Sequence, residues 1–299
     1  VGEEIILLGA HHDHLGLGGP NSGSRQPDTS AVHNGADDNA SGVGVMLKVA
    51  EKLKDSIKGS NYMFIAFSGE EMGLLGSNYF TKNPTIDLNE ANYMINMDMV
   101  GRLRDDKTLS ISGTGTAPIW NQVLNSTNPG FKLVLNESGV GPSDHTSFYL
   151  QNIPVLHFFT GQHEDYHKPS DDSEKLNYEG MRMIGGYILN VISELDDDAK
   201  LAFRTTKNES EDVPRFKVAL GVMPDYLFDG KGMRIDGVTE DRPAAIAGLQ
   251  KGDVVIQLGD STVVDMMSYM RALSTFEEGD STKVVVDRKG EKVEAAITF

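Results

Sequence analysis

The sequence has no cysteine and few basic residues for its length of 299. Without cysteine there is no disulfide framework and no thiolate metal site, so any metal ion must be bound by histidine and carboxylate side chains. Lysine and arginine total 27 against 44 aspartates and glutamates, and the net charge of −17 argues against nucleic acid or an anionic membrane as a partner. No apolar run reaches the ~20 residues of a membrane span, and no signal peptide or initiator methionine is present.

The composition is otherwise that of a folded protein, and it changes along the chain. Hydrophobic residues make up 39%, and the length suits about two domains of ~100–200 residues. All eight histidines lie within the first 167 residues, and residues 1–212 contain 16 basic against 30 acidic residues, a net charge of −14. The polar stretch 207–214 lacks apolar periodicity and indicates a linker. We therefore predict domains at 1–206 and 215–299, with the chemistry in the first.

The first region alternates between two hydrophobic patterns. Nearly continuous apolar runs at 5–10, 62–67, 93–97 and 154–159 are typical of strands buried on both faces. Apolar residues at helical spacing occur within 42–54, after Pro118 and across 183–192. This alternation predicts an α/β fold in which a mixed, largely parallel central sheet is flanked by helices. Such sheets bind ligands beyond the carboxyl ends of their strands.

Acidic residues and histidines gather at the predicted strand ends and before the first helix. They lie in the segments 9–14, 35–42, 68–71, 96–99 and 165–171. Such groups are costly to desolvate unless positive charge holds them together. Imidazole and carboxylate without thiolate suit zinc or a neighbouring transition metal. Two metal ions about 3.5–4 Å apart can clamp both an attacking water and the oxygen of the group under attack.

The order of these motifs, His-x-Asp, Asp-Asn, Glu-Glu, Asp and Tyr-His, resembles the M28 family of co-catalytic zinc aminopeptidases over about residues 1–200. The resemblance implies two Zn²⁺ ions, with other divalent transition metals as alternatives. It implies that His11 and Asp98 bind one ion, that His167 and Glu71 bind the other, and that Asp38 bridges them.

The same resemblance implies roles for further residues. Glu70 is expected to be the general base that takes a proton from the attacking water and passes it to the leaving amine. The hydroxyl of Tyr166 is expected to steady the tetrahedral oxyanion. Asp13 and Asp171 are expected to orient the first and the second ligand imidazole, respectively. The family also implies a cis peptide bond after the bridging aspartate.

Several residues near these motifs have simpler interpretations. We interpret His12, His14, His33 and His163 as surface residues or as neighbours of the ligand set, and His157 as a hydrogen-bonded core histidine. The role of the segment Asp144-His145 stays open. The loop 18–31, rich in glycine and polar residues, is either a lid over the cleft or a disordered insertion.

From residue 216 the pattern changes to short alternating strands, at 218–222, 232–238, 254–258, 262–264, 283–287 and 292–299, with a helix at 266–276. The segment 241–255, which contains Ala-Gly-Leu-x-x-Gly-Asp, resembles the PDZ domains attached to bacterial proteases. The resemblance implies a small, mainly-β domain that takes up the C-terminus of an extended peptide. Leu220, Gly221 and Val222 match its carboxylate-binding loop. A groove that is unused, or filled by the protein's own chain, is the alternative.

These resemblances together predict a metal-dependent exopeptidase. The most specific prediction is a dizinc aminopeptidase that acts on peptides with a free N-terminus and recruits substrates or partners through its PDZ domain. Dipeptidase, carboxypeptidase and glutaminyl cyclase activities are alternatives within the same resemblance. An inactive scaffold that works through its PDZ domain is the rival from another class. Family habit and the missing initiator methionine lead us to expect an exported protein, whether periplasmic, cell-surface or secreted.

Overall fold

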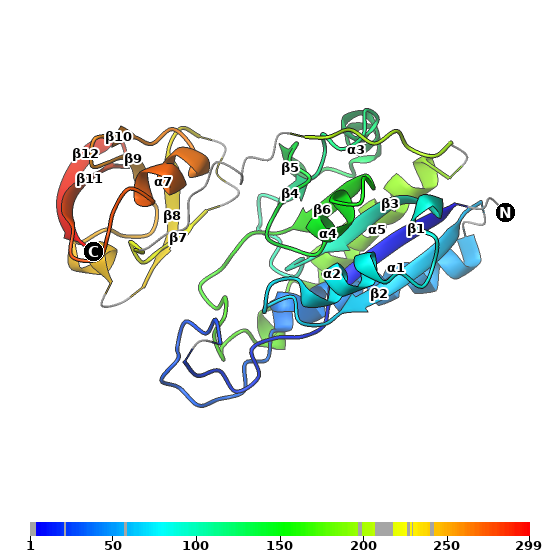
Figure 1. Ribbon diagram of the computed structural model, residues 1–299, viewed down its shortest axis with the longest axis horizontal. Helices are drawn as coiled ribbons and strands as arrows, with labels where there is room; N and C mark the ends of the chain where they lie inside the picture. Colours follow the sequence, from blue (N-terminus) through cyan, green and yellow to red (C-terminus); the bar gives the residue numbers. More distant parts are fainter. Residues whose placement is uncertain are drawn as a thin grey trace. The chain divides into compact units, whose positions relative to one another are not determined.

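A computed structural model describes residues 4–20, 22–56, 59–196, 199–206, 218–225, 228, 230–239 and 242–299. These residues divide into two compact units, which are described separately (Figure 1). The first is formed mainly by residues before 207 and the second mainly by residues after 217. The predicted linker at 207–214 lies outside the described residues. Within the described residues, no helix has the length and apolar character needed to cross a membrane.

The first unit is built on a six-stranded sheet in the order β2-β1-β3-β6-β4-β5. The strands are β1 (Ile5–His11), β2 (Asn61–Phe67), β3 (Ala91–Met97), β4 (Thr108–Ser112), β5 (Lys132–Asn136) and β6 (Val155–Phe159). Every neighbouring pair is parallel except β4 and β6, which are antiparallel. The sheet is therefore mixed and largely parallel, as the sequence predicts.

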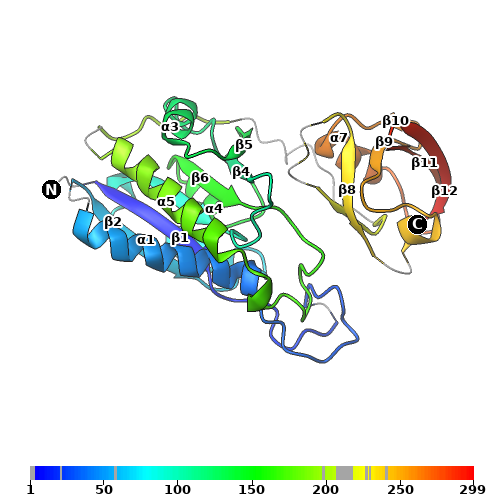
Figure 2. The same ribbon diagram turned by 180° about the vertical axis from the view of Figure 1, so that it is seen from behind.

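One face of this sheet is covered by three helices. Side chains of a strand point alternately to opposite faces, and Ile6 and Leu8 of β1 belong to the larger hydrophobic core. That core also contains residues of α1 (Gly42–Ser56), α3 (Trp120–Thr127) and α5 (Tyr178–Glu194). Figure 2 shows α1 and α5 side by side across this face.

The opposite face is covered by shorter helices. Leu7, which lies between the two residues of β1 just named, packs in a second cluster with Phe148 of α4 (His145–Tyr149). Phe80 of α2 (Leu75–Lys82) packs against the same cluster. Burial on both faces explains why the central strands consist of nearly continuous apolar residues.

Two strands and two α-helices in the described part of the first unit are absent from the sequence predictions. The strand β4 has the sequence TLSIS, in which hydroxyl residues interrupt the apolar run, and β5 is only partly buried. The helix α2 contains glycine, serine, asparagine and threonine, all of low helix propensity, and α4 has five residues. Because their local sequence patterns are weak, these elements depend on tertiary packing rather than on intrinsic propensity for their stability.

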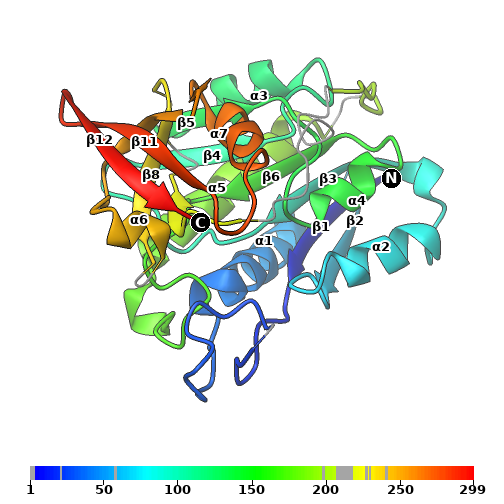
Figure 3. The ribbon, with the colours of Figure 1, turned by 60° about the vertical axis from the view of Figure 1, so that its left-hand side comes forward.

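The second unit is an antiparallel sheet in the order β12-β11-β9-β8-β7, with β10 paired to β9. Its elements are β7 (Val222–Pro224), β8 (Met233–Val238), α6 (Pro243–Ile246), β9 (Val254–Leu258), β10 (Ser261–Thr262), α7 (Met266–Leu273), β11 (Ser281–Arg288) and β12 (Glu291–Thr298). Figure 3 shows β11 and β12 as neighbouring strands. The predicted strand at 218–222 is wrong in its position, because the strand begins at Val222, and the predicted helix at 266–276 ends at Leu273.

Candidate metal centre

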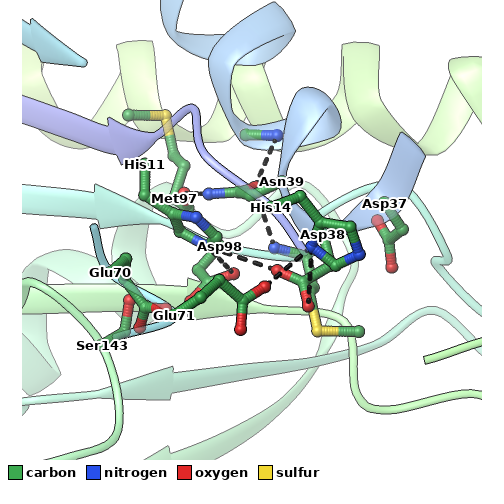
Figure 4. A network of polar contacts seen from close by, with 12 residues as sticks. His11, His14, Asp37, Asp38, Asn39, Glu70, Glu71, Met97, Asp98 and Ser143 are labelled. Atoms are coloured by element: carbon green, nitrogen blue, oxygen red, sulfur yellow. Dashed lines mark hydrogen bonds and ion pairs between the residues drawn. The ribbon is translucent and has the colours of Figure 1, made fainter. Parts of the chain in front are cut away.

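The five predicted metal ligands come from five segments that meet at one edge of the first sheet. His11 ends β1, Glu71 follows β2 and Asp98 follows β3. Asp38 lies in the irregular turn before α1, and His167 follows β6. The carboxyl ends of parallel strands lie at the same edge of a sheet, which brings these distant parts of the sequence together. In Figure 4 the labelled carboxylates of Asp38 and Asp98 lie beside His11, and that of Glu71 is joined to His14.

Asp38 lies between the two predicted ligand imidazoles. Its Oδ1 is 3.3 Å from His11 Nε2, and its Oδ2 is 3.2 Å from His167 Nε2. Asp98 Oδ1 lies 3.4 Å from the same nitrogen of His11, and Glu71 Oε2 lies 3.1 Å from that of His167. The structure thus contains two adjacent sets of three donors that share the carboxylate of Asp38.

The spacing of these donor atoms fits zinc. Nitrogen and oxygen ligands ~2.0–2.2 Å from a tetrahedral zinc ion lie about 3.3–3.6 Å from one another, close to the observed 3.1–3.4 Å. Strong charge-assisted hydrogen bonds are shorter, at ~2.7–2.9 Å, and His167 Nε2 is buried without a well-formed hydrogen bond. The Nδ1 atoms of His11 and His167 donate to the backbone carbonyls of Asp13 and Gly23, at 3.1 and 3.0 Å. In the neutral imidazole, this tautomer leaves the lone pair of each Nε2 available to a metal ion, which would take the place of the proton there.

The electrostatics of the centre favour added positive charge. Burial disfavours a protonated imidazole, yet the carboxylates of Asp98 and Asp38 raise the pKa of His11 far above its ordinary value. Against the same penalty, Asp38 and Glu71 raise the pKa of His167 to about 10. Among the described residues, the recorded ion pairs of these three carboxylates are with histidines alone. Asp38 is buried, Asp98 and Glu71 are half-buried, and a dication is a suitable partner for carboxylates in such positions.

Glu70 lies beside the His11 half of the centre. A carboxylate oxygen of Glu70 lies within 4.8 Å of ligand atoms of His11 and Asp98. Burial and the charge of Asp98 raise the pKa of Glu70 to about 9, so this side chain can hold a proton near neutral pH. Its backbone N–H donates to Asp13 Oδ1 at 3.2 Å. That carboxylate lies 3.8 Å from His11 Nδ1, and the backbone carbonyl of Asp13 accepts the hydrogen bond of the imidazole at 3.1 Å. The orienting role of the Asp13 side chain stays a prediction.

Asp171 has other partners than the predicted imidazole of His167. Its carboxylate accepts hydrogen bonds from the backbone N–H groups of Asp37 and Asp38, at 2.8 and 3.1 Å, and from Arg102 at 3.1 Å. Asp171 therefore holds the backbone of the bridging residue. The peptide bond between Asp38 and Asn39 is cis, as the family resemblance implies.

Tyr166 lies next to the centre with its hydroxyl protonated. Its ring stacks on that of His167, with 3.8 Å between the ring centroids. Burial, with the charges of Asp38 and Glu71, raises the pKa of Tyr166 far above its ordinary value. The phenol is therefore a hydrogen-bond donor at any physiological pH.

Two histidines that the sequence analysis left outside the ligand set lie close to it. His14 Nδ1 donates to Glu71 Oε1 at 2.7 Å, and His14, Asp38 and Glu71 form a further group of possible metal ligands. His33 is buried, at 3% exposure. Three histidines within residues 11–14 were a signal for His14, whereas His33 carries no comparable motif.

The core histidine has an unexpected neighbour. His157 is buried, and its ring stacks on that of His145, with 4.5 Å between the centroids. His157 Nε2 and both ring nitrogens of His145 are buried without hydrogen-bond partners among the described residues. Burial lowers the pKa of both rings, so both are neutral.

The predicted carboxylate-binding loop of the second unit has one residue that must be glycine. Gly221 has φ of 79°, in the left-handed region, and a Cβ there would lie 2.2 Å from that of Arg242. Leu220 is buried in the core of the unit, and Val222 begins β7.

Comparison with known proteins agrees with this architecture. Residues 2–192 match the model of peptidase family M28, and residues 200–299 match that of the PDZ domain. The first part of the chain is thus that of a peptidase. More particularly, the chain belongs to peptidase family M28, and it carries a C-terminal PDZ domain.

Individual relatives are distant and longer than this chain. It is 30% identical to aminopeptidase YwaD of Bacillus subtilis over 64% of this chain and 41% of that protein. It is 28% identical to a probable leucine aminopeptidase of Trichophyton verrucosum over 58% of this chain and 49% of that protein. The chain therefore spans about half the length, or less, of these relatives.

Solved structures share the fold of the first unit. The zinc aminopeptidase BSAP from Bacillus subtilis has a TM-score of 0.54 and 25% identity, over 70% of this chain and 48% of that chain. A glutaminyl cyclase of Porphyromonas gingivalis also has a TM-score of 0.54, over 64% of this chain and 73% of that chain, but at 22% identity it is similar in fold alone.

Proposed function

We propose that the protein is a dizinc aminopeptidase that removes residues from the free N-terminus of peptides. The observation that carries the proposal is the shared carboxylate of Asp38, whose two oxygens face His11 and His167. Asp98 and Glu71 add one carboxylate to each half. In this proposal the five residues hold two zinc ions, with other divalent transition metals as alternative occupants. The similarity to a zinc aminopeptidase of known structure supports this assignment.

The proposed mechanism gives each neighbouring side chain one task. When bound, the metal ions would supply Lewis acidity toward the peptide carbonyl and a water molecule. Glu70 lies within 4.8 Å of ligand atoms of His11 and Asp98, and the positive charge of bound metal ions would lower its pKa and leave its carboxylate ionised. That carboxylate would take the proton of the water and deliver it to the leaving amine. The neutral phenol of Tyr166 donates a hydrogen bond to the developing oxyanion.

Selectivity for a free N-terminus is supported by charge. Residues 1–212 carry a net charge of −14, and an acidic surface attracts the α-ammonium group of a peptide. The two aminopeptidase relatives named above favour the same reaction over dipeptidase, carboxypeptidase or cyclase activity. We further propose that the PDZ domain binds the C-terminus of a peptide, with the backbone of Leu220, Gly221 and Val222 receiving its carboxylate.

The proposal is tested with the full chain after removal and re-addition of zinc. We expect two zinc ions per chain by elemental analysis, and release of p-nitroaniline from leucine p-nitroanilide. The N-acetylated substrate is the matched control and should not be cleaved, because it lacks the ammonium group. Two bound zinc ions without any hydrolysis would favour the inactive scaffold. Cleavage of the acetylated substrate alone would contradict the aminopeptidase assignment.

A further inference from the structure

The loop between the first two ligand motifs encloses His167 from two sides. The backbone carbonyl of Gly23 accepts a hydrogen bond from His167 Nδ1 at 3.0 Å. The backbone N–H of Arg25 donates to the backbone carbonyl of His167, also at 3.0 Å. The two loop residues that flank Ser24 therefore fix both the imidazole and the main chain of one proposed metal ligand.

Ser24 is itself held by a buried histidine. His33 Nδ1 donates to the carbonyl of Ala31 at 3.1 Å, so its Nε2 is the acceptor for the Ser24 hydroxyl at 2.7 Å. His33 is 3% exposed, and a Cβ at Gly18 would lie 2.3 Å from its ring. The glycine thus leaves room for the histidine, and the histidine fixes the position of Ser24.

The backbone conformation of His167 is one that needs support from its surroundings. Its φ of 57° lies in the left-handed region, which is uncommon for residues other than glycine. The guanidinium of Arg25 also lies over the ring of Tyr166, 5.3 Å from the centroid, and that ring stacks on His167. The loop therefore supports His167 in a backbone conformation that it rarely adopts unaided.

The other half of the centre has no such dependence. His11 Nδ1 donates to the carbonyl of Asp13, two residues along the same strand end. The orientation of His11 is therefore set within its own segment, whereas that of His167 depends on residues more than 140 positions away in the sequence.

We propose that Ser24 and His33 are positioning residues for His167, and that the loop 22–33 is a structural part of the His167 half of the metal centre. The inference rests on the proposed dizinc function. It predicts that a change that disrupts the loop lowers the affinity for the metal ion at His167 and leaves the affinity for the other ion unchanged. Because coupling between binding and order is reciprocal, a metal ion at His167 should in turn protect the loop from opening.

The test compares variants of the full chain by zinc competition with a chromogenic chelator. In Ser24→Ala, we expect one of the two zinc dissociation constants to rise by ~10–100-fold, the usual effect of losing a residue that supports a ligand, and the other to stay unchanged. Ser24→Thr keeps the hydroxyl and should restore the lost affinity. Ser126→Ala alters an exposed serine of α3, outside the loop, and should change neither constant.

A second variant and a second measurement keep the inference testable if Ser24→Ala folds poorly. His33→Leu should weaken the same zinc ion. The loss in the double variant should be smaller than the sum of the two single losses, because both changes break the hydrogen bond between Ser24 Oγ and His33 Nε2. Zinc should slow amide hydrogen exchange at residues 22–26 in the wild type but not in Ser24→Ala. Unchanged zinc constants, or equal weakening of both ions, would overturn the inference and leave the dizinc proposal standing. A wild-type chain that binds no zinc would overturn both.

Discussion

The PDZ unit and the metal centre of the peptidase unit differ in the partners of their buried carboxylates. In the PDZ unit, Asp225 and Asp253 are 6% and 1% exposed, and arginine side chains donate to both. In the peptidase unit, the carboxylates of the metal centre have only histidines as recorded partners among the described residues. A buried acid paired with arginine stabilises a fold. A buried acid with no arginine or lysine side chain beside it is a candidate site for a bound cation.

The same contrast separates neighbouring residues inside the peptidase unit. Asp171 is fully buried but paired with Arg102, and its other oxygen holds the backbone N–H groups of Asp37 and Asp38. Asp38 has no arginine partner within the described part of the chain, and its two oxygens face the imidazoles of His11 and His167. The carboxylate of Asp171 therefore holds the backbone that carries Asp38 in place.

Removing the shared charge should have the largest effect. Asp38→Asn takes one negative charge from both halves of the proposed centre, so we expect loss of zinc from both and a fall in peptidase activity of more than ~10⁴-fold, beyond the loss of a proton-transfer residue alone. Zinc content and turnover of leucine p-nitroanilide measure the two effects. Asp105→Asn, at an exposed residue outside the metal centre and its supporting loop, is the control. An Asp38→Asn protein that keeps two zinc ions would contradict the bridging role.

The adjacent glutamates allow a sharper comparison. Glu70→Gln should keep both zinc ions and lose ~10²–10⁴-fold in kcat, because it removes proton transfer but no ligand. Glu71→Gln should lower the zinc affinity of the His167 half. Zinc stoichiometry and kcat, measured on both variants, separate the two roles. Since Glu70 also lies near ligand atoms of His11 and Asp98, loss of zinc in Glu70→Gln would show that it is a ligand and not the base.

How far the sequence could predict this centre depends on which atoms form it. Side-chain ligands such as His11 and Asp98 can be recognised in the sequence by their residue type. The predicted parallel strands then place them together, because the carboxyl ends of such strands lie at one edge of the sheet. The carbonyl of Gly23 leaves no such record, because every residue has one. His33 and Asp171 could be named as polar residues, but their partners depend on how a loop folds back. The strands β4 and β5 could not be predicted for a related reason. Their hydrogen-bonded pairing with neighbouring strands defines them, and their local hydrophobic pattern is weak.

Zinc should stabilise one unit and not the other. A ligand that binds only the folded state raises the free energy of unfolding by about 2.7 kcal/mol per site at one hundred times its dissociation constant. We expect calorimetry to show an upward shift of the peptidase transition with zinc, while the PDZ transition stays in place. The Asp38→Asn variant is the control and should show no shift. An equal shift of both transitions would show that zinc stabilises both units, and it would contradict the assignment of the zinc sites to the peptidase unit alone.

The smallest predicted effect concerns the arginine-paired acid of the PDZ unit. Asp253 accepts two hydrogen bonds of 2.7 Å from Arg288 and one of 3.0 Å from the Gln250 N–H. Burial opposes its ionisation, but these donors outweigh burial and lower its pKa. A lowered folded pKa stabilises the protein above the unfolded value of ~3.9, and this contribution is lost as the pH falls through the folded value.

Asp253→Asn should therefore reduce the free energy of unfolding of the PDZ unit by about 2 kcal/mol at pH 7, the scale of a hydrogen bond to a charged group. The difference from the wild type should begin to shrink below pH ~3.9, where the unfolded chain takes up the proton, and should be lost only once the pH falls through the lowered pKa of the folded carboxyl group. Denaturant unfolding at pH 7 and pH 3 measures this, with the exposed Asp260→Asn as control. Zinc binding and peptidase turnover should not change. If the variant were equally destabilised at both pH values, packing rather than charge would account for the role of Asp253, and the contrast between the two kinds of buried acid would rest on the metal centre alone.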